Sequence, residues 1–291
     1  MITPAEFAAR HRPGTPLLLP NAWDVASAYR LVALGYDAIA TTSLGVAVAN
    51  GLHDGAGEAA TETMRLAERL TAAGIGVTVD IESGFSDDPD EVARFVRRLS
   101  ELGVLGVNLE DADATGALID PELAAAKVAA VVAAAPELYV NARTDVFWLG
   151  AGDSEADRES SAIARAKRYV AAGASGVFVP GTMPIEVIAR IAGEVVAPLN
   201  VLPQPGVPFA GLAAAGVARV STGSALFRAA LGAIEDALGS MFDSGARTGT
   251  IPSYAETAAL VDLDVDAAHG SEQADANSAL AHDHGDAIPL G

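Results

Sequence analysis

The sequence predicts an α/β protein, and within that class a (β/α)8 TIM barrel. Short apolar runs rich in branched side chains recur along the chain, which is typical of strands buried in a parallel sheet. Stretches with helical spacing, many of them rich in alanine, lie between these runs. The eight predicted strands are Leu17–Pro20, Ala38–Thr41, Val77–Asp80, Gly106–Leu109, Leu138–Asn141, Gly176–Val179, Leu199–Leu202 and Arg219–Ser221. A doubly wound open sheet is the main alternative, but no phosphate-binding loop or dinucleotide fingerprint favours it.

The stretches between the predicted strands indicate helices with glycine at their ends. We expect helices over Asp90–Leu102, Pro121–Ala135, Ser154–Ala172 and Pro184–Ala192. Glycine is typical of the position just after a helix, where the backbone turns toward the next strand. Five such glycines precede predicted strands, namely Gly35, Gly74, Gly103, Gly173 and Gly216. The order of elements is therefore strand then helix, repeated around the predicted barrel.

The sequence predicts three segments. Residues 1–245 are expected to form the catalytic barrel domain, ending in one or two helices over Gly223–Ser244. Residues 246–263 are expected to form a helical extension, and residues 264–291 an acidic flexible tail. The tail contains His269, His282 and His284, which could bind a metal, although a solvated tail is the favoured interpretation.

The composition excludes several classes of function. The 291 residues include 38 Asp+Glu against 18 Lys+Arg, and the formal charge of -20 opposes general binding to nucleic acids or anionic membranes. Cysteine is absent, which removes disulfides, thiolate metal sites and cysteine nucleophiles. We find neither an apolar span of roughly twenty residues nor a secretory signal. The sequence therefore predicts a cytoplasmic protein that acts on a small molecule.

Acidic residues stand where two of the predicted strands end. Asp80 and Glu82 close the run that begins at Val77, and Glu110 and Asp111 close the next one. The carboxyl ends of barrel strands are where enzymes of this architecture keep their chemistry. Converging carboxylates repel one another unless a cation neutralises them, and oxygen ligands favour Mg²⁺, with Mn²⁺ as a second option. The alternatives are a turn-capping role for Asp80 and a solvated acidic turn at Glu110 and Asp111.

Other polar residues follow the remaining strands. Asn21 and Asp24 follow the first predicted strand, and Thr42–Gly45 follows the second. The segment Asn141–Asp145, which includes Arg143, stands at the end of the fifth. Arg143 could pair with Asp145 or Glu110, but an arginine beside so many acids also suits bidentate binding of a substrate carboxylate or phosphate. The Thr42–Gly45 segment is either a small-residue turn or a set of backbone N–H groups that hold an oxyanion.

Five ordered motifs resemble those of the isocitrate lyase/phosphoenolpyruvate mutase superfamily. They are Leu19-Pro-Asn-Ala-Trp-Asp24, Thr42-Ser-Leu-Gly45, Val79-Asp-Ile-Glu-Ser-Gly-Phe85, Asn108-Leu-Glu-Asp111 and Asn141-Ala-Arg-Thr-Asp145. The resemblance covers about residues 5 to 245. It implies a barrel whose final helix is exchanged between subunits of a homodimer or homotetramer. It also implies Mg²⁺-dependent chemistry on 2-oxo or 2-hydroxy acids through an enolate-like intermediate.

The resemblance assigns roles to residues at matching positions. Asp80 is similar to the acid nearest the metal, with Glu82 and Glu110 holding the ion directly or through water. Ser43, Leu44 and Gly45 match the segment whose backbone amides receive the substrate, and Asp80 and Arg143 complete the substrate-binding set. Asp54, in the Gly51–Gly55 segment, falls where the family has an acid on a mobile segment. Asp54, Arg143 and Asp111 are the candidate catalytic residues, although Asp113 or a metal-bound water could equally be the base.

The departures from the family pattern concern the loop after the fourth predicted strand. Asp111–Asp120 stands where the isocitrate and methylisocitrate lyases carry a loop with an acid/base cysteine, and where the phosphonate-forming mutases carry a gating segment. Glu82 also replaces the more usual aspartate. The leading hypothesis is a Mg²⁺-dependent carbon–carbon lyase or decarboxylase acting on a small di- or tricarboxylate. The alternatives are P–C bond chemistry, meaning phosphoenolpyruvate mutation or phosphonopyruvate hydrolysis, and a non-catalytic barrel that binds a metal and a carboxylate.

Overall fold

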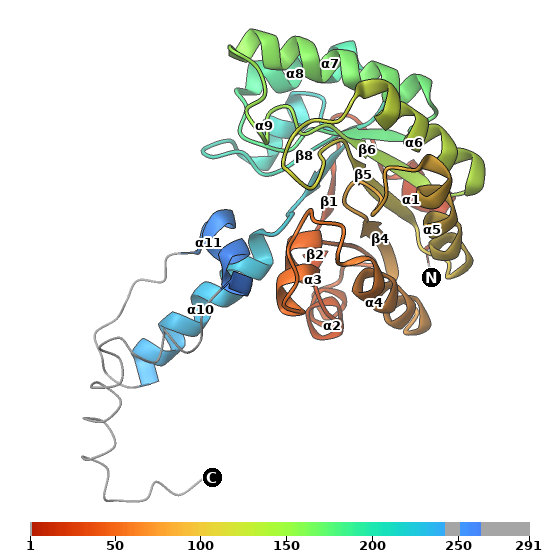
Figure 1. Cartoon of the computed structure of the whole chain (residues 1–291). Coiled ribbons are helices and arrows are strands. Elements are labelled where there is room, and N and C mark those ends of the chain that lie inside the picture. Colours follow the sequence, from red (N-terminus) through yellow and green to blue (C-terminus); the bar gives the residue numbers. More distant parts are fainter. Residues whose placement is uncertain (1, 242–250, 263–291) are drawn as a thin grey trace, which may run out of the picture.

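A single parallel sheet in nearly closed barrel form lies at the centre of the molecule (Figure 1). The computed structural model describes residues 2–241 and 251–262. Within them the sheet contains β1 (Leu17–Leu19), β2 (Asn21–Ala22), β3 (Ala38–Thr41), β4 (Gly76–Asp80), β5 (Gly106–Glu110), β6 (Tyr139–Arg143), β7 (Gly176–Phe178), β8 (Leu199–Val201) and β9 (Arg219–Ser221). The strands follow the order β1-β9-β8-β7-β6-β5-β4-β3-β2. The prediction of an α/β barrel is confirmed.

The first predicted strand is split at Pro20 into two short strands. Among the described residues the barrel therefore contains nine strands, although eight were predicted. Proline has no backbone N–H and cannot continue the hydrogen-bond ladder on that side. β1, before Pro20, pairs with β9, and β2, after it, pairs with β3. One stretch of chain therefore bridges the two edges of the sheet. The other seven predicted strands are confirmed to within two residues at each end.

Helices surround the sheet, and the four predicted between Asp90 and Ala192 are confirmed to within two residues at each end. They are α1 (Pro4–Ala9), α2 (Val25–Ala33), α3 (Ser43–Ala49), α4 (Ala60–Ala72), α5 (Pro89–Glu101), α6 (Pro121–Ala134), α7 (Glu155–Ala171), α8 (Ile185–Glu194), α9 (Phe209–Ala214), α10 (Ala225–Met241) and α11 (Tyr254–Ala258), with a 3-10 turn over Ala259–Asp262. The five helix-terminal glycines all have positive φ, between 77° and 102°. This backbone conformation costs glycine little, whereas a side chain would strain it.

The last two helices differ in how they meet the barrel, because α10 leads away from the strands whereas α11 contacts α3. Figure 1 shows α10 extending away from the strands, with α11 returning alongside it. Residues 242–250 and 263–291 lie outside the described residues. The predicted boundary at residue 245, the whole acidic tail over residues 264–291 and its three histidines therefore remain predictions. No helix in the described ranges combines the length and apolar character needed to cross a bilayer.

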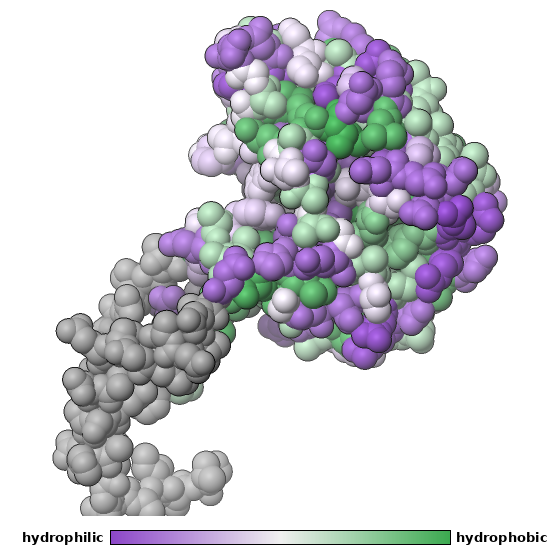
Figure 2. Space-filling view, viewed as in Figure 1, coloured by the Kyte–Doolittle hydropathy of each residue, from purple (hydrophilic) through white to green (hydrophobic). Residues whose placement is uncertain are grey.

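Alternate residues of the strands face the helices and the barrel interior. Val77, Val79 and Val107 are fully buried in the core beneath the helices. Asp80 and Glu110, on the opposite faces of the same strands, line a cavity at the mouth of the barrel. Figure 2 shows hydrophilic side chains over much of the visible outer surface. The alternation therefore directs a few acids inward while the helices carry most of the charge.

The opposite end of the barrel is closed by the N-terminal helix and a buried histidine. The His11 ring stacks on Tyr139 with 4.0 Å between ring centroids, and its Nδ1 lies 2.9 Å from the Phe7 carbonyl oxygen. Burial, assisted by the positive charge of Arg219, lowers the pKa of His11 to about 3. His11 is therefore neutral in the folded protein at all but strongly acidic pH.

The depressed pKa of His11 predicts a specific loss of stability in acid. In the unfolded chain a histidine titrates at about 6.5. Below that pH the unfolded chain binds a proton that the folded chain does not bind until pH falls to about 3. Stability therefore falls with falling pH across this window, by about 1.4 kcal/mol per pH unit for one group. His11→Phe keeps an aromatic ring and should remove this slope when urea unfolding is compared between about pH 7 and about pH 5. Identical pH dependence in the two proteins would contradict the prediction.

Candidate active site

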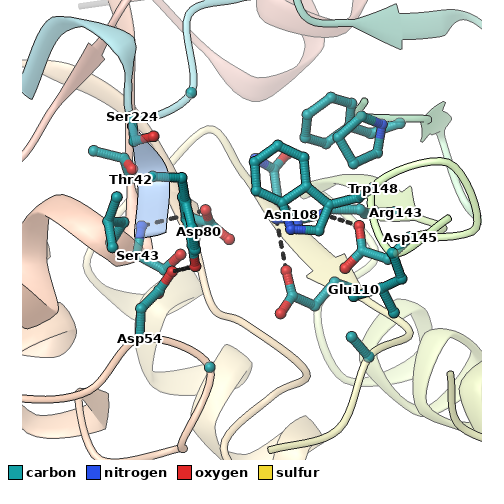
Figure 3. Close-up of a pocket in the computed structure, with 18 of the residues that line it drawn as sticks. Thr42, Ser43, Asp54, Asp80, Asn108, Glu110, Arg143, Asp145, Trp148 and Ser224 are labelled. Carbon is teal, nitrogen blue, oxygen red and sulfur yellow. Dashed lines mark hydrogen bonds and ion pairs between the residues drawn. The ribbon is translucent and has the colours of Figure 1, made fainter. Parts of the chain in front are cut away.

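One cavity of about 330 Å³ opens at the carboxyl ends of the strands. Its lining includes residues from all eight predicted strand ends, which are far apart in the sequence. Ser43 follows β3, Asp80 ends β4, Glu110 ends β5 and Arg143 ends β6. Figure 3 shows Ser43, Asp54 and Asp80 on one side of the cavity, and Glu110, Arg143 and Trp148 on the other. The closed, parallel sheet brings these side chains to one opening.

Asp80 is held by the turn that leads into α3. The backbone N–H of Ser43 donates a hydrogen bond to Asp80 Oδ2 at 3.3 Å, and the Asp80 N–H donates to Thr41 Oγ1 at 2.9 Å. Asp80 Oδ1 is buried and has no hydrogen-bond partner among the residues that the structure describes. Burial raises the pKa of Asp80, Asp54 adds to the rise, and Arg143 opposes it. One carboxylate oxygen of Asp80 is therefore held by a backbone N–H group, while the negative charge of the other is not balanced by a hydrogen bond from the described residues.

The predicted oxyanion segment divides between the cavity and the core. Ser43 and Leu44 line the cavity, while Gly45 lies one position further along α3. A Cβ atom on Gly45 would come within 2.6 Å of Trp23 Cβ and 2.9 Å of Thr42 Cγ2. Glycine is thus required here for packing against Trp23, whereas the N–H group at the cavity is that of Ser43, which faces Asp80.

Asp54 lies at the cavity and is contacted by the C-terminal segment. The Tyr254 hydroxyl donates a short hydrogen bond to Asp54 Oδ2, and Asp54 Oδ1 is buried without a partner. The Tyr254 ring meets the edge of Trp148 with 5.1 Å between centroids. His53 lies 2.9 Å from Asp262 through its Nε2 and the Asp262 Oδ1. The segment carrying Asp54 is therefore anchored from a part of the chain two hundred residues away.

Glu82 does not line the cavity but supports its wall. Its backbone has a φ of 50°, a left-handed conformation that is uncommon for a residue with a side chain. The Gly57 N–H donates to Glu82 Oε2 at 3.0 Å, while Oε1 is buried without a partner. Burial raises the pKa of Glu82 to about 7. Glu82 thus connects the end of β4 to the turn that follows Asp54.

Arg143 is paired with two carboxylates on the opposite side of the cavity. Its Nη1 lies 2.6 Å from Glu110 Oε2, and its Nε donates to Asp145 Oδ1 at 2.6 Å. Burial acts to lower the pKa of Arg143, but the charges of Asp145 and Glu110 outweigh burial and raise it well above its usual value. Burial raises the pKa of Glu110, and the positive charge of Arg143 opposes this rise. The predicted pairing alternative for Arg143 is present with both acids, and within the described residues its Nη2 makes no hydrogen bond or ion pair.

The structure does not bring Asp111 to the cavity. Asp111 Oδ1 accepts from the Asp145 backbone N–H at 2.8 Å, and Oδ2 accepts from Tyr169 at 2.6 Å and from Arg165 Nη1 at 3.0 Å. Both oxygens are thus occupied behind the cavity wall, and Asp111 itself is buried. Its position indicates that Asp111 fixes the start of the loop after β6. Asp24 is also away from the cavity, because its carboxylate caps α2.

The acids of the site suit a cation, though not as a ready-made cage. Within the described residues, four carboxylate oxygens are buried without a hydrogen bond, and apart from Glu110 Oε2, which pairs with Arg143, they are Asp54 Oδ1, Asp80 Oδ1 and Glu82 Oε1. An unpartnered buried carboxylate is costly, and a bound cation removes that cost. Within residues 2–241 and 251–262, no three carboxylate or imidazole groups are arranged to hold one ion together. Of these acids, Asp80 and Asp54 line the cavity, and each keeps one unpartnered buried oxygen within the described residues.

Three aromatic residues at the cavity were not predicted from the sequence. Trp148, Phe178 and Tyr254, together called the aromatic wall below, all line it. The Arg143 Cζ atom lies 5.9 Å from the Trp148 ring centroid and 5.7 Å from that of Phe178. Trp148 lies three residues beyond Asp145, and Phe178 lies within the predicted strand Gly176–Val179, so both stand close in the sequence to predicted site positions. No local pattern places Tyr254 at the site, because its contacts there are long-range.

A parallel barrel with acids and one arginine around a cavity at its carboxyl end defines an α/β-barrel protein of the kind that carries enzyme active sites. The chain belongs to the phosphoenolpyruvate phosphomutase family, whose sequence model matches residues 7–242. The resemblance to the isocitrate lyase/phosphoenolpyruvate mutase superfamily is thereby confirmed. That superfamily contains lyases and mutases, which supports an enzyme.

Several relatives have the same length or fold. An uncharacterized protein of Mycobacterium tuberculosis is 44% identical over 259 residues, which is 89% of this chain and 97% of that protein. A 2-methylisocitrate lyase of Halalkalibacterium halodurans is 29% identical over 63% of this chain and 61% of its own. The structure of a candidate phosphonomutase from Burkholderia cenocepacia J2315 has a TM-score of 0.76 at 37% identity, covering 81% of this chain and 98% of that one. A 2,3-dimethylmalate lyase matches in fold, with a TM-score of 0.71 at 22% identity over 96% of this chain and 99% of its own.

Proposed function

We propose that the protein is a Mg²⁺-dependent carbon–carbon lyase that acts on a small 2-oxo or 2-hydroxy carboxylic acid. The observation that carries this proposal is the position of Asp80, whose free buried oxygen faces the same cavity as Arg143. An anionic substrate placed between the two would have a cation site at one end and a guanidinium at the other. The family relationship to lyases supports carbon–carbon cleavage.

Asp80 would hold the divalent ion directly, with Glu82 and Glu110 acting through water. Bound there, the ion supplies stabilisation of the negative charge that develops on the oxo oxygen. The Ser43 N–H positions Asp80, and the free Nη2 of Arg143 orients the substrate carboxylate. Asp54 has one free oxygen at the cavity and is the best-placed group to exchange a proton with the substrate. Tyr254 holds the other oxygen of Asp54.

A screen of mono- and dicarboxylic 2-oxo and 2-hydroxy acids, with and without Mg²⁺, tests this function. We expect Mg²⁺-dependent release of pyruvate, glyoxylate, oxalate or another small 2-oxo acid from at least one compound. Complete inactivity across the panel, in protein that binds Mg²⁺, would contradict the proposal and favour a non-catalytic barrel.

P–C bond chemistry is a second candidate, because the matching family model is that of phosphoenolpyruvate phosphomutase. Phosphorus NMR with phosphonopyruvate separates the two, since the lyase leaves this compound unchanged. The Asp111–Asp120 loop does not separate the two candidates, because it lacks both the acid/base cysteine of the lyases and the gating segment of the mutases.

We further propose a homodimer or homotetramer in which α10 packs on a second copy. Ile234, Leu238 and Met241 are exposed on α10, at a spacing that places them along one face. Light scattering of the full chain should give a mass of two or four subunits, and Leu238→Asp should lower that mass. A monomeric wild-type protein would contradict this proposal.

A further inference from the structure

Tyr254, a member of the aromatic wall, spans the mouth of the cavity. Its ring packs edge-on against Trp148 with 5.1 Å between ring centroids, and its hydroxyl donates a short hydrogen bond to Asp54 Oδ2. Asp54 and Trp148 stand on opposite sides of the cavity (Figure 3). Because Tyr254 lines the cavity itself, a bound substrate would lie beside its hydroxyl as well as beside Asp54.

The segment that carries Tyr254 is anchored on both sides of this residue. Arg228 Nη1 donates to the carbonyl oxygen of Pro252 at 2.9 Å, two residues before Tyr254. Thr257, three residues after it, is fully buried, and α11 contacts α3. The phenol ring is therefore presented to the cavity by a packed segment, although it comes from a distant part of the sequence.

Carbon–carbon cleavage of a 2-hydroxy acid needs both a base and an acid. The base removes the hydroxyl proton on C2, and as the C2–C3 bond breaks, C2 becomes the carbonyl carbon of a 2-oxo acid. The electron pair stays with C3, where a neighbouring carboxylate takes up the charge as an enolate until a proton reaches C3. Asp54 suits the first role, because its Oδ1 is buried at the cavity without a partner among the described residues.

Tyr254 is the best proton donor for C3 among the described residues that line the cavity. That lining contains no histidine, lysine or cysteine, and its other hydroxyl groups belong to serine and threonine. A phenol, with a pKa of about 10 in water, is a far stronger acid than an aliphatic hydroxyl. The carboxylates of Glu110 and Asp145 are paired with Arg143.

The hydrogen bond between Tyr254 and Asp54 couples the two groups. Burial raises the pKa of Tyr254, and the negative charge of Asp54 raises it further, so the hydroxyl keeps its proton while Asp54 is ionised. When Asp54 takes up the hydroxyl proton of the substrate, that charge disappears and the hydrogen bond loses its charge assistance. The Tyr254 hydroxyl then becomes a stronger acid that can turn toward C3. Neutralising the base therefore activates the acid.

We infer that Tyr254 is the catalytic acid that protonates the carbon released by bond cleavage, in a proton relay with Asp54. Asp54 Oδ1 accepts the hydroxyl proton, the C2–C3 bond breaks, and the proton of the Tyr254 hydroxyl forms the new bond to C3. The proton on Asp54 then passes to the tyrosinate oxygen after the carboxyl group rotates about its Cβ–Cγ bond. Both groups are restored without a further reactant. The relay rests on the proposed function and adds the proton donor to it.

Trapping of the carbanion tests this assignment on the full chain with Mg²⁺. The probes are malate, 2-methylmalate and 2,3-dimethylmalate, and release of the 2-oxo acid is measured with and without hexacyanoferrate(III), which oxidises carbanions. Tyr254→Phe should lower turnover without the oxidant by about 10²–10⁴-fold, the usual contribution of a general acid. Because its carbanion stays unprotonated, this variant should reduce hexacyanoferrate(III) and regain 2-oxo acid release, whereas the oxidant should leave the wild-type rate unchanged.

Three controls separate the acid from a structural role. Asp54→Asn lacks the base, so it should form no carbanion and the oxidant should not restore its turnover. Tyr29→Phe removes an exposed hydroxyl from α2 outside the cavity lining and should behave as the wild type. Mg²⁺ should raise the melting temperature of Tyr254→Phe as it does that of the wild type, because a proton donor to carbon is not needed to bind the ion.

The possible failures are distinguishable. Wild-type turnover in Tyr254→Phe would mean that Asp54 returns its own proton to C3, which overturns the inference and leaves the proposed function in place. Lost turnover that the oxidant does not restore, as in Asp54→Asn, would mean that Tyr254 only positions Asp54, which also overturns it. If the wild-type protein binds Mg²⁺ but cleaves none of the three probes, the relay is wrong, and the wider screen of 2-oxo and 2-hydroxy acids then decides the proposed function.

Discussion

Replacing Asp80 with asparagine should reduce turnover of the substrate found in the screen by about 10³-fold or more. Several kcal/mol of charge stabilisation depend on the ion that Asp80 would hold, and each 1.36 kcal/mol corresponds to a factor of ten in rate. Asparagine has the same shape and still accepts the hydrogen bond from the Ser43 N–H. The measurement is kcat/KM with saturating Mg²⁺.

The same substitution should make the protein more stable when no metal is present. Burial raises the pKa of Asp80, which means that the ionised form is disfavoured in the folded state. A neutral amide removes that penalty. Mg²⁺ should raise the melting temperature of the wild-type protein by binding to its folded form, and should not do so for Asp80→Asn.

A matched control is Asp88→Asn, which removes a carboxylate from the exposed N-cap of α5. Asparagine caps helices as well as aspartate does, so activity and metal response should stay those of the wild type. Full activity in Asp80→Asn, or an undiminished response to Mg²⁺, would remove Asp80 from the proposed site.

Replacing Asp111 with alanine should lower the free energy of unfolding by about 3–5 kcal/mol. The substitution leaves the largely buried Arg165 without its carboxylate partner and Tyr169 without its acceptor. For a chain of this size each kcal/mol lowers the melting temperature by about 2–4 °C, so we expect a fall of about 10 °C. Urea and thermal unfolding measure the effect directly.

Glu194→Ala provides the comparison for Asp111→Ala. Glu194 also pairs with a cation, Lys167, but both side chains are exposed, and such pairs contribute at most about 1 kcal/mol. If Asp111→Ala were as mild as Glu194→Ala while abolishing turnover, Asp111 would be catalytic and its assignment as a structural residue would be wrong.

Much of the fold was predictable because it depends on local patterns. Branched apolar residues predict strands at Val77–Asp80 and Gly106–Leu109, and both are strands in the structure. Glycines such as Gly103 and Gly173 end helices through their own backbone preference, which does not depend on the rest of the chain. The first strand was predicted as one run, Leu17–Pro20; its split at Pro20, which closes the barrel, appeared only from the pairing partners of β1 and β2.

The candidate site was predictable only where position along a strand fixes the direction of a side chain. Asp80, Glu110 and Arg143 end neighbouring strands on the inward face, so the barrel brings them to one cavity. Asp111 differs from Glu110 by one residue and therefore faces the other way, where Arg165 and Tyr169 from α7 receive it. Tyr254 reaches Asp54 from two hundred residues away, a contact that no local pattern encodes.

The sequence by itself determined that this chain folds as a parallel α/β barrel, that acids and one arginine stand at the ends of its strands, and that cysteine chemistry is absent. Only the tertiary structure decided which of those acids share a cavity, which are already paired, and where aromatic rings join them. The physical reason is that strand and helix propensities act over a few neighbouring residues. Burial, pairing and the charge balance of a cavity, in contrast, depend on residues that meet only when the barrel closes.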